Sequence, residues 1–313
     1  MTKNLNAMGE FYERLGKRVV QSENASWFEV QPRVLLSFPS YKVVQPHEAE
    51  LDALMRKFKL LAIRYPTVLD GFGFISALPV NTHRDYNLSC LHQKARNQTR
   101  RGMEICVVEE IDFDYLAEKG LALNQDTAER QGFKNLYADP AYWVKYCRAA
   151  REVSGVSAWG AFVEGQLGAF LIAIEIDDWV EWVVNHSSTV LRKKYANNAL
   201  AFKAAQHFFQ KKGCKAICYG LGSLEPIAPL DHFKQRMGWT LEPGKQRIVF
   251  SKKMGGIFSW ANEPCLKIVG GLFPRNYYVR KTIAMIRLHR QQTRCMPAPV
   301  SEQESPGEAS NNE

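Results

Sequence analysis

The sequence has 313 residues, a formal net charge of +9, and 46% hydrophobic and 12% aromatic residues, proportions that are typical of a globular protein. Its longest apolar runs, such as residues 168–174, have the length of a strand, which excludes a membrane-spanning helix. The first twenty residues are polar and lack the apolar stretch of a signal peptide. We therefore expect a soluble, cytoplasmic protein.

Charge and cysteine content narrow the possible partners. Segment 301–313 carries only acidic charges, so the rest of the chain is more basic than the total indicates. A basic body suits acidic partners such as coenzyme A phosphates, nucleic acid or anionic lipid, and a solvated basic surface accounts for it equally well. The cysteines form no Cys-x-x-Cys pair, which predicts reduced thiols and no metal site.

The first part of the chain predicts helices alternating with strands. Residues 8–17 form a short helix, and residues 33–38 form a strand. Pro46 begins a helix that ends before Pro66. The residues on its apolar side are Leu51, Leu54, Met55, Phe58, Leu61 and Ala62. Residues 71–78 follow as a strand after a glycine-rich turn.

A helix dense in cations is predicted over residues 88–101. Its cations are Lys94, Arg96, Arg100 and Arg101. They form either a solvated face or a contact for an acidic substrate or cofactor, because side chains three and four apart share one face. A strand over 103–109, a helix toward Gln131 and a helix over 142–153 come next.

Two strands, residues 158–163 and 167–176, are joined by the tight turn 164–166 as a hairpin. The next strand, residues 179–185, alternates with period two. One face of that strand carries Val180, Trp182 and Val184, and the other carries Trp179, Glu181 and Val183.

A basic loop, residues 192–197, connects this strand to a helix over residues 198–212 with one buried face. Residues 215–219 form the next strand, and Pro229 opens a short helix that Gly238 ends. Residues 240–249 form the terminal strands, with Pro243-Gly244 turning between them. An antiparallel meander that feeds one strand–helix–strand unit predicts an α/β protein with a mixed sheet and flanking helices.

The order of these elements resembles the acyl-CoA-binding half of the GNAT (Gcn5-related N-acetyltransferase) superfamily. The stretch Gly213-Cys-Lys-Ala-Ile-Cys-Tyr-Gly220, followed by Leu230-Asp-His-Phe-Lys-Gln-Arg-Met-Gly238, is similar to a GNAT subgroup related to Fem-type (FemAB-like) peptidyltransferases. The resemblance is good over 155–250 and weaker back to residue 85. It implies a GNAT-like fold in which a parallel strand pair splays at the acyl-CoA site.

The resemblance and the loop together predict a site. Free N–H groups at a helix start favour anions, so the loop is expected to hold the pyrophosphate of acetyl-CoA or another acyl-CoA. The loop lacks the glycines of the usual GNAT pattern. The predicted cofactor-binding residues are Ser187, Thr189, Arg192, Lys193, Lys194, Tyr195, Ala196 and Asn197.

The resemblance implies Glu181 as the base, because the same strand carries one in many relatives. His186 follows that strand and titrates in a useful range. Tyr219 would replace the usual tyrosine acid, since Phe233 stands at the nearest position. No metal is predicted.

Three functions stay open. The first is N-acyl transfer from acyl-CoA to the amine of an unidentified small molecule, amino sugar or envelope precursor. The second is Fem-type aminoacyl transfer, and the third is a non-catalytic GNAT scaffold that binds nucleic acid or an anionic membrane.

The predicted organisation is an N-terminal extension (1–25), a GNAT-like domain (26–250, best supported over 85–250), a basic C-terminal segment (251–294) and a disordered tail (295–313). Residues 275–294 read as a helix with six cations and no acid. It either packs on the domain or contacts an anionic membrane or another polyanion, which would place the protein at the inner membrane surface.

Overall fold

The computed structural model describes all residues except 1–5, 133–134, 212, 226, 261 and 295–313. The strands are β1 (Val19–Gln21), β2 (Ser26–Gln31), β3 (Val34–Phe38), β4 (Ala62–Thr67), β5 (Phe74–Asn81), β6 (Cys106–Ile111), β7 (Val156–Val163), β8 (Gln166–Ile176), β9 (Trp179–Ser187), β10 (Ala216–Cys218) and β11 (Thr240–Phe250). The α-helices are α1 (Ala7–Arg14), α2 (Glu48–Phe58), α3 (Gln93–Ile105), α4 (Phe113–Gln131), α5 (Pro140–Arg151), α6 (Ala196–Gln210), α7 (Ala228–Arg236), α8 (Lys252–Trp260), α9 (Glu263–Leu272) and α10 (Tyr277–Arg290).

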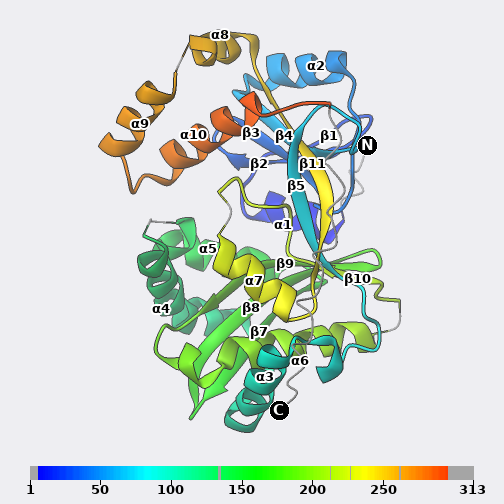
Figure 1. Ribbon diagram of the computed structural model, residues 1–313, viewed down its shortest axis with the longest axis vertical. Coiled ribbons are helices and arrows are strands. Elements are labelled where there is room, and N and C mark those ends of the chain that lie inside the picture. Colours follow the sequence, from blue (N-terminus) through cyan, green and yellow to red (C-terminus); the bar gives the residue numbers. More distant parts are fainter. Residues whose placement is uncertain (1–5, 133–134, 212, 226, 261, 295–313) are drawn as a thin grey trace, which may run out of the picture.

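The strands form one mixed sheet in the order β1-β2-β3-β4-β11-β5-β10-β9-β8-β7-β6. Two parallel pairs lie within it, β3 with β4 and β9 with β10, and each pair is bridged by a helix, α2 or α6. The sheet therefore contains two strand–helix–strand units, one at the top of Figure 1 and one below. The predicted mixed-sheet α/β fold is confirmed.

The sheet has two halves, a first half with β1 to β5 and a second half with β6 to β10. Two connections join these halves. β5 pairs with β10, with Asn81 opposite Ile217. β11 leaves α7 in the second half and inserts between β4 and β5 of the first (Figure 1). β11 bonds to strands of the first half on both sides, so a strand that follows the second half in sequence completes the sheet of the first half.

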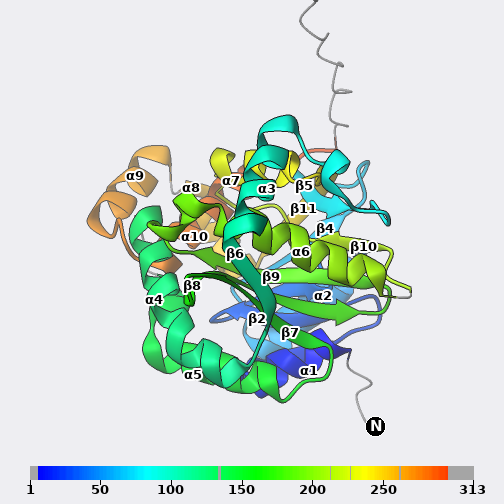
Figure 2. The ribbon, with the colours of Figure 1, turned by 90° about the horizontal axis from the view of Figure 1, so that it is seen from below.

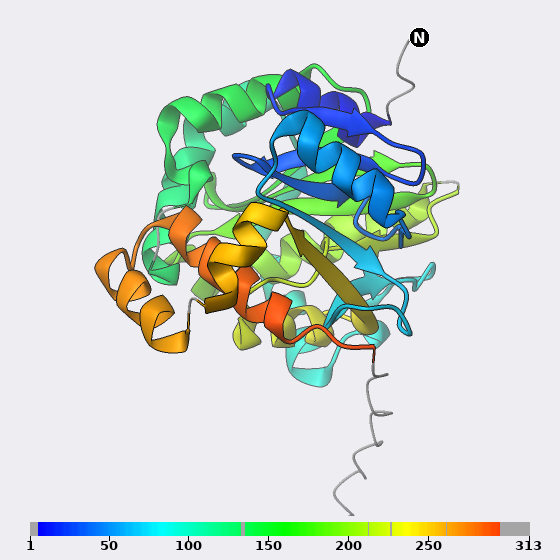
Figure 3. The same cartoon turned by 90° about the horizontal axis from the view of Figure 1, so that it is seen from above.

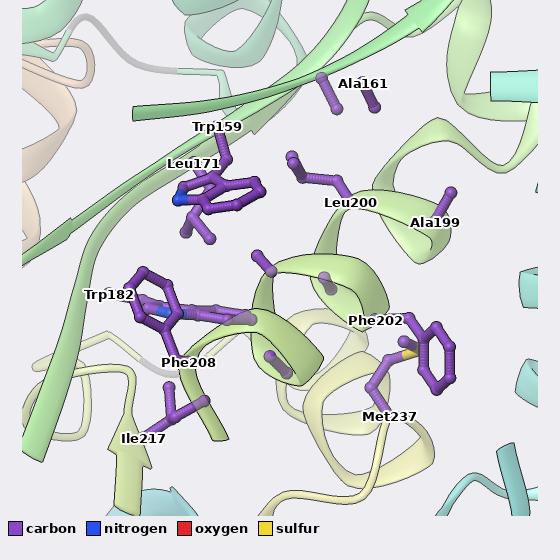
Figure 4. Packing of buried hydrophobic residues seen from close by; sticks show 14 of the residues in the cluster. Trp159, Ala161, Leu171, Trp182, Ala199, Leu200, Phe202, Phe208, Ile217 and Met237 are labelled. Atoms are coloured by element: carbon purple, nitrogen blue, oxygen red, sulfur yellow. The ribbon is translucent and has the colours of Figure 1, made fainter. Parts of the chain in front are cut away.

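Helices cover both faces of the second half (Figure 2). α3 and α6 pack on one face, and α1, α4 and α5 pack on the other. In Figure 4 the indole of Trp182 lies against α6 beside Phe208, and Leu200 packs toward Trp159. Each large apolar side chain buried in this way contributes roughly 1.5–3 kcal/mol.

The first half is also covered on both faces (Figure 3). α2 packs Leu51 and Met55 on one face, and α10 places Ala284 and Met285 in the cluster on the other. The cations of α10 find acids elsewhere in the chain. Glu225 pairs with Arg280 and Lys281, and Glu263 pairs with Arg287.

Three sequence expectations are corrected. The helix from Pro46 ends at Phe58, where Lys59 takes a left-handed conformation (φ 51°), and residues 62–67 are strand β4, not helix. Residues 240–250 form one continuous strand. The Pro243-Gly244 turn is absent because β5 and β4 flank this strand and hold it extended.

The third correction concerns the strand that carries Glu181. β8 pairs Ile172 with Val184 and Ala173 with Trp182, so Val183 is an extra residue, a β-bulge. The bulge reverses the alternation. Trp182 therefore lies in the core beneath α6, whereas Val184 lies in the core on the opposite face.

The predicted domain boundaries stay predictions. Within segment 1–25, α1 buries Met8 and Phe11 in the core cluster beneath α4 and α5, and β1 pairs with β2. The tail 295–313 lies outside the described residues. Among the helices that the structure describes, none has the length and apolar character required to cross a bilayer.

Candidate active site

A cavity of about 260 Å³ lies where the two halves of the sheet meet. β2, β3 and β4 line it from the first half. β9, the loop after β10 and the region of α5 line it from the second, and α1 and Tyr277 of α10 complete the lining. Its polar or ionisable lining residues are Tyr12, Lys17, Ser40, Arg64, Asn135, Tyr137, Tyr142, Tyr146, Glu181, Trp182, Tyr219 and Tyr277.

Glu181 is the carboxylate of this cavity. It is 5% exposed, and Ser40 donates to it through the backbone N–H (3.1 Å, to Oε2) and the hydroxyl (2.5 Å, to Oε1). Burial raises the pKa of Glu181, and the two Ser40 hydrogen bonds oppose that shift. A carboxyl with a raised pKa is a better proton acceptor near neutral pH than an exposed one.

The strand geometry explains why Glu181 reaches a cavity. β10 pairs with β9 only as far as Cys218 opposite Glu181, and the Val183 bulge follows at once. Gly220 then turns the chain away with φ 72°, and a Cβ there would stand 3.3 Å from the Glu181 Oε1. The parallel pair therefore separates beside Glu181.

Aromatic rings fill the space where the strands separate. The ring centroids of Trp182 and Tyr219 lie 5.0 Å apart, those of Trp182 and Trp239 lie 5.0 Å apart, and those of Tyr219 and Trp239 lie 5.3 Å apart. The splay predicted for the thioester is thus packed with side chains on the α6 face, and the open volume lies on the side of Ser40 and α1.

Tyr219 also lines the cavity. Asn185 donates to its hydroxyl at 3.4 Å, and the ammonium of Lys234 lies 5.2 Å from its ring centroid. Burial raises the pKa of Tyr219, so the phenol stays protonated at neutral pH and can donate a hydrogen bond or a proton. The structure therefore brings two of the predicted catalytic residues, Glu181 and Tyr219, to one cavity.

His186 is held elsewhere. Its Nδ1 lies 2.5 Å from the Asn124 Oδ1, which makes Nδ1 the protonated nitrogen, and its ring packs against Tyr137 and Phe170. Desolvation, and secondarily the charge of Arg130, lower its pKa to about 4. The residue does not line the cavity of Glu181.

The predicted anion-binding loop has a definite conformation. Residues 191–194 form a 3-10 turn, and Tyr195 (φ 62°) caps α6, which begins at Ala196. Within the described chain, the backbone N–H groups of Ala196 and Asn197 have no hydrogen-bond partner. These groups fit an anion at the helix start.

The side chains around this helix start agree with that fit in part. Arg192, Lys193 and Lys194 are exposed, and no acid of the described residues pairs with them. The N–H and hydroxyl of Thr189 donate to Asp126, so they are not available to bind an anion. The Ser187 carbonyl accepts from Arg130, which also bonds to Thr189.

The loop and the cavity are well separated. Glu181 and Ser187 are six residues apart on β9, which corresponds to about 20 Å at the rise of a strand. A single donor can reach both places only if its anionic group and its acyl group are joined by a long arm. Coenzyme A is a molecule of that form.

Sequence reasoning missed part of the cavity. Ser40 follows β3 and lies 141 residues from Glu181 along the chain, so no local spacing links them. Tyr12 on α1 and Tyr277 on α10 come from segments outside the recognised region. The sequence gives no signal for Arg64, because the predicted helix from Pro46 to the residue before Pro66 includes it.

No protein-family model matches this sequence, and no curated protein matches it. Solved structures do. The crystal structure of FemX matches with a TM-score of 0.57 and 12% identity, covering 83% of this chain and 94% of that one. The C-terminal domain of a protein assigned as a lysylphosphatidylglycerol synthetase from Agrobacterium fabrum matches with a TM-score of 0.54 and 13% identity, covering 82% and 91%.

These likenesses define the class of fold. The protein has a GNAT-like fold, and the match to FemX extends over most of both chains. At this level of identity the likeness concerns the fold alone. The activity therefore has to be argued from the cavity itself.

Proposed function

We propose that the protein is an acyltransferase that moves an acyl group from acyl-CoA to an amine bound in the cavity beside Glu181. The observation that supports this most is the buried Glu181 carboxyl, held by Ser40 at the point where β9 and β10 separate. Acyl transfer requires a base for the attacking amine and a proton donor for the leaving group. Glu181 and Tyr219 suit these two roles.

In the proposed reaction Glu181 accepts a proton from the acceptor ammonium, which leaves a neutral amine. The amine nitrogen then bonds to the acyl carbon and the bond to the donor sulfur breaks. Tyr219 stands as the donor of a proton to the thiolate, and the proton that the nitrogen loses on becoming an amide restores the phenol. When bound, coenzyme A would supply the activated thioester, and the chain's own part is to hold, orient and move protons.

The donor is proposed to place its pyrophosphate at the N-terminus of α6. The free N–H groups of Ala196 and Asn197, with the charges of Arg192, Lys193 and Lys194, support this. The turnover assay is direct. Acetyl-CoA and a panel of amines should release free thiol, and release without any amine present would speak against transfer to an acceptor.

Fem-type aminoacyl transfer is the second candidate. The likeness to FemX, the aromatic filling between Trp182 and Trp239, and the lack of glycine at the loop favour it. Calorimetry with coenzyme A separates the candidates, because an aminoacyl donor carried by another molecule requires no coenzyme A site.

Replacing both Lys193 and Lys194 with glutamate should weaken coenzyme A binding by at least about 1 kcal/mol, the scale of one charge-assisted hydrogen bond. Isothermal calorimetry measures the dissociation constant. The matched control replaces Lys203 on α6 and Lys211 at its end, which lie away from the helix start. An unchanged dissociation constant in the folded Lys193/Lys194 variant would remove the loop from the site.

A cytoplasmic location stays a prediction. Contact of residues 275–294 with an anionic membrane or another polyanion also stays a prediction. The ion pairs of Glu225 with Arg280 and Lys281 support packing on the domain instead. We expect full-length protein to show no salt-dependent co-sedimentation with anionic liposomes. We also expect Glu225→Gln to lower the free energy of unfolding by about 1 kcal/mol. Liposome binding that added salt abolishes would contradict the packing of this segment on the domain.

A further inference from the structure

Arg64 is a partly buried cation that the proposed reaction does not use. It stands on β4, and its side chain lines the cavity that contains Glu181. Its Nε donates to the Gln246 Oε1 at 2.6 Å, and its Nη2 donates to the Gly222 carbonyl at 2.9 Å. Both partners are neutral, so these bonds orient the guanidinium without neutralising it.

No carboxylate among the described residues pairs with Arg64. The neighbouring Arg247 on β11 shows the contrast, because it pairs with Glu48. Within the described chain the Nη1 of Arg64 has no hydrogen-bond partner. Desolvation lowers the pKa of Arg64 to about 10, so the group is still charged at neutral pH. An unpaired charge that is partly removed from water has a cost unless something compensates for it.

The rest of the cavity does not supply that compensation. Its charged lining residues are Lys17, Arg64 and Glu181. The two oxygens of Glu181 already accept from Ser40. Tyr277, at the start of α10, lines the same cavity near Arg64 and brings a neutral phenol. The two cations, Lys17 and Arg64, outnumber the one carboxyl, Glu181, so the cavity has an excess of positive charge.

We propose that the acceptor is an amine that also carries an anionic group, and that this group binds the guanidinium of Arg64 while the amine faces Glu181. This inference rests on the proposed function. A guanidinium held by two bonds presents its remaining N–H groups as a fixed fork, which matches the oxygens of a carboxylate or a phosphate. Arg64 would thus select the acceptor and fix its orientation.

The test compares acceptors in matched pairs. L-alanine with L-alaninamide probes a carboxylate, and glucosamine 6-phosphate with glucosamine probes a phosphate. With acetyl-CoA as donor, wild type should prefer the anionic member of at least one pair about tenfold or more in kcat/KM. Arg64→Gln should abolish this ratio, and Arg64→Lys should keep part of it. A ratio cancels a general loss of activity or stability, so a purely structural role of Arg64 would not change it.

Arg247→Gln is the matched control and should keep the wild-type ratio, because Arg247 already pairs with Glu48 and does not line the cavity. No preference in wild type, or a preference that survives in Arg64→Gln, would overturn the proposal. If wild type releases no thiol with any acceptor, the acyl-CoA reaction fails first. Calorimetry with the same four compounds then decides, since anion binding that is lost in Arg64→Gln supports the anion site alone, and absent binding overturns both.

Discussion

Glu181→Gln is expected to lower turnover by about 10²-fold or more while coenzyme A binding is unchanged, because a positioned general base typically contributes that factor. Glutamine keeps the size of the side chain and one oxygen that can accept from Ser40, so the cavity should persist. Steady-state kinetics measures the loss, and calorimetry measures donor binding. Retained turnover across the pH range would refute the assignment.

The pH dependence makes this prediction more specific. Burial raises the pKa of Glu181, so the rising limb of kcat/KM should lie above pH 4.5, the ordinary value for a glutamate, and should vanish in Glu181→Gln. Glu175→Gln on β8 is the matched control. Glu175 is paired with Lys211 at 2.7 Å outside the cavity, and its replacement should leave both rate and pH profile unchanged.

The raised pKa of Glu181 favours turnover, but it lowers the free energy of unfolding at higher pH. A carboxyl whose pKa is raised on folding stabilises the protein below its unfolded pKa, and that contribution is lost as pH rises through the folded value. Glu181→Gln should therefore flatten the decline of unfolding free energy above pH 4.5. A residue that is costly to ionise but needed for turnover is expected at an active site.

The unit from β9 through α6 to β10 could be predicted from the sequence because its signals are local. Period-two alternation and one buried helical face define each element within a few residues. Strand–helix–strand order then indicates the parallel pair. The bulge at Val183 could not be predicted, since it is defined only by the pairing with β8.

In the first half of the sheet, dependence on long-range strand pairing limits what the sequence can predict. Leu61 and Ala62 continue the apolar stripe of the preceding helix, and only the place of residues 62–67 between β3 and β11 makes them a strand. Likewise, Pro243-Gly244 has the composition of a turn, yet two neighbouring strands hold it extended. The sequence does not indicate the second strand–helix–strand unit, because the two units share an architecture without a visible sequence repeat.

Only part of the candidate site can be predicted from the sequence, again because the rest depends on long-range pairing. Glu181 and Tyr219 belong to the recognisable unit, whereas Ser40, Arg64 and Tyr277 reach the cavity through the joined sheet and the C-terminal helix. The charge pattern of residues 275–294 likewise does not indicate which acids pair with this helix. Its repulsion is offset by Glu225 and Glu263, which are distant from it in sequence.

His186→Gln is expected to make the protein more resistant to acid. The pKa of His186 is about 4 when folded against an ordinary value of 6.5, so the folded state binds fewer protons between these values. Stability that is present above pH 6.5 is therefore lost as pH falls toward 4. The loss corresponds to about 2 kcal/mol near pH 5 and at most about 3 kcal/mol in full, at 1.36 kcal/mol for each pKa unit.

Glutamine removes the titration and keeps an N–H that can donate to Asn124, so the variant should unfold at lower pH than wild type while their stabilities converge near neutrality. Urea unfolding at a series of pH values measures the difference. His232→Gln on the exposed side of α7 is the matched control and should retain the wild-type acid limb. Because His186 lies outside the cavity, the same variant should turn over normally. A large loss of turnover with unchanged acid stability would instead return His186 to the catalytic machinery.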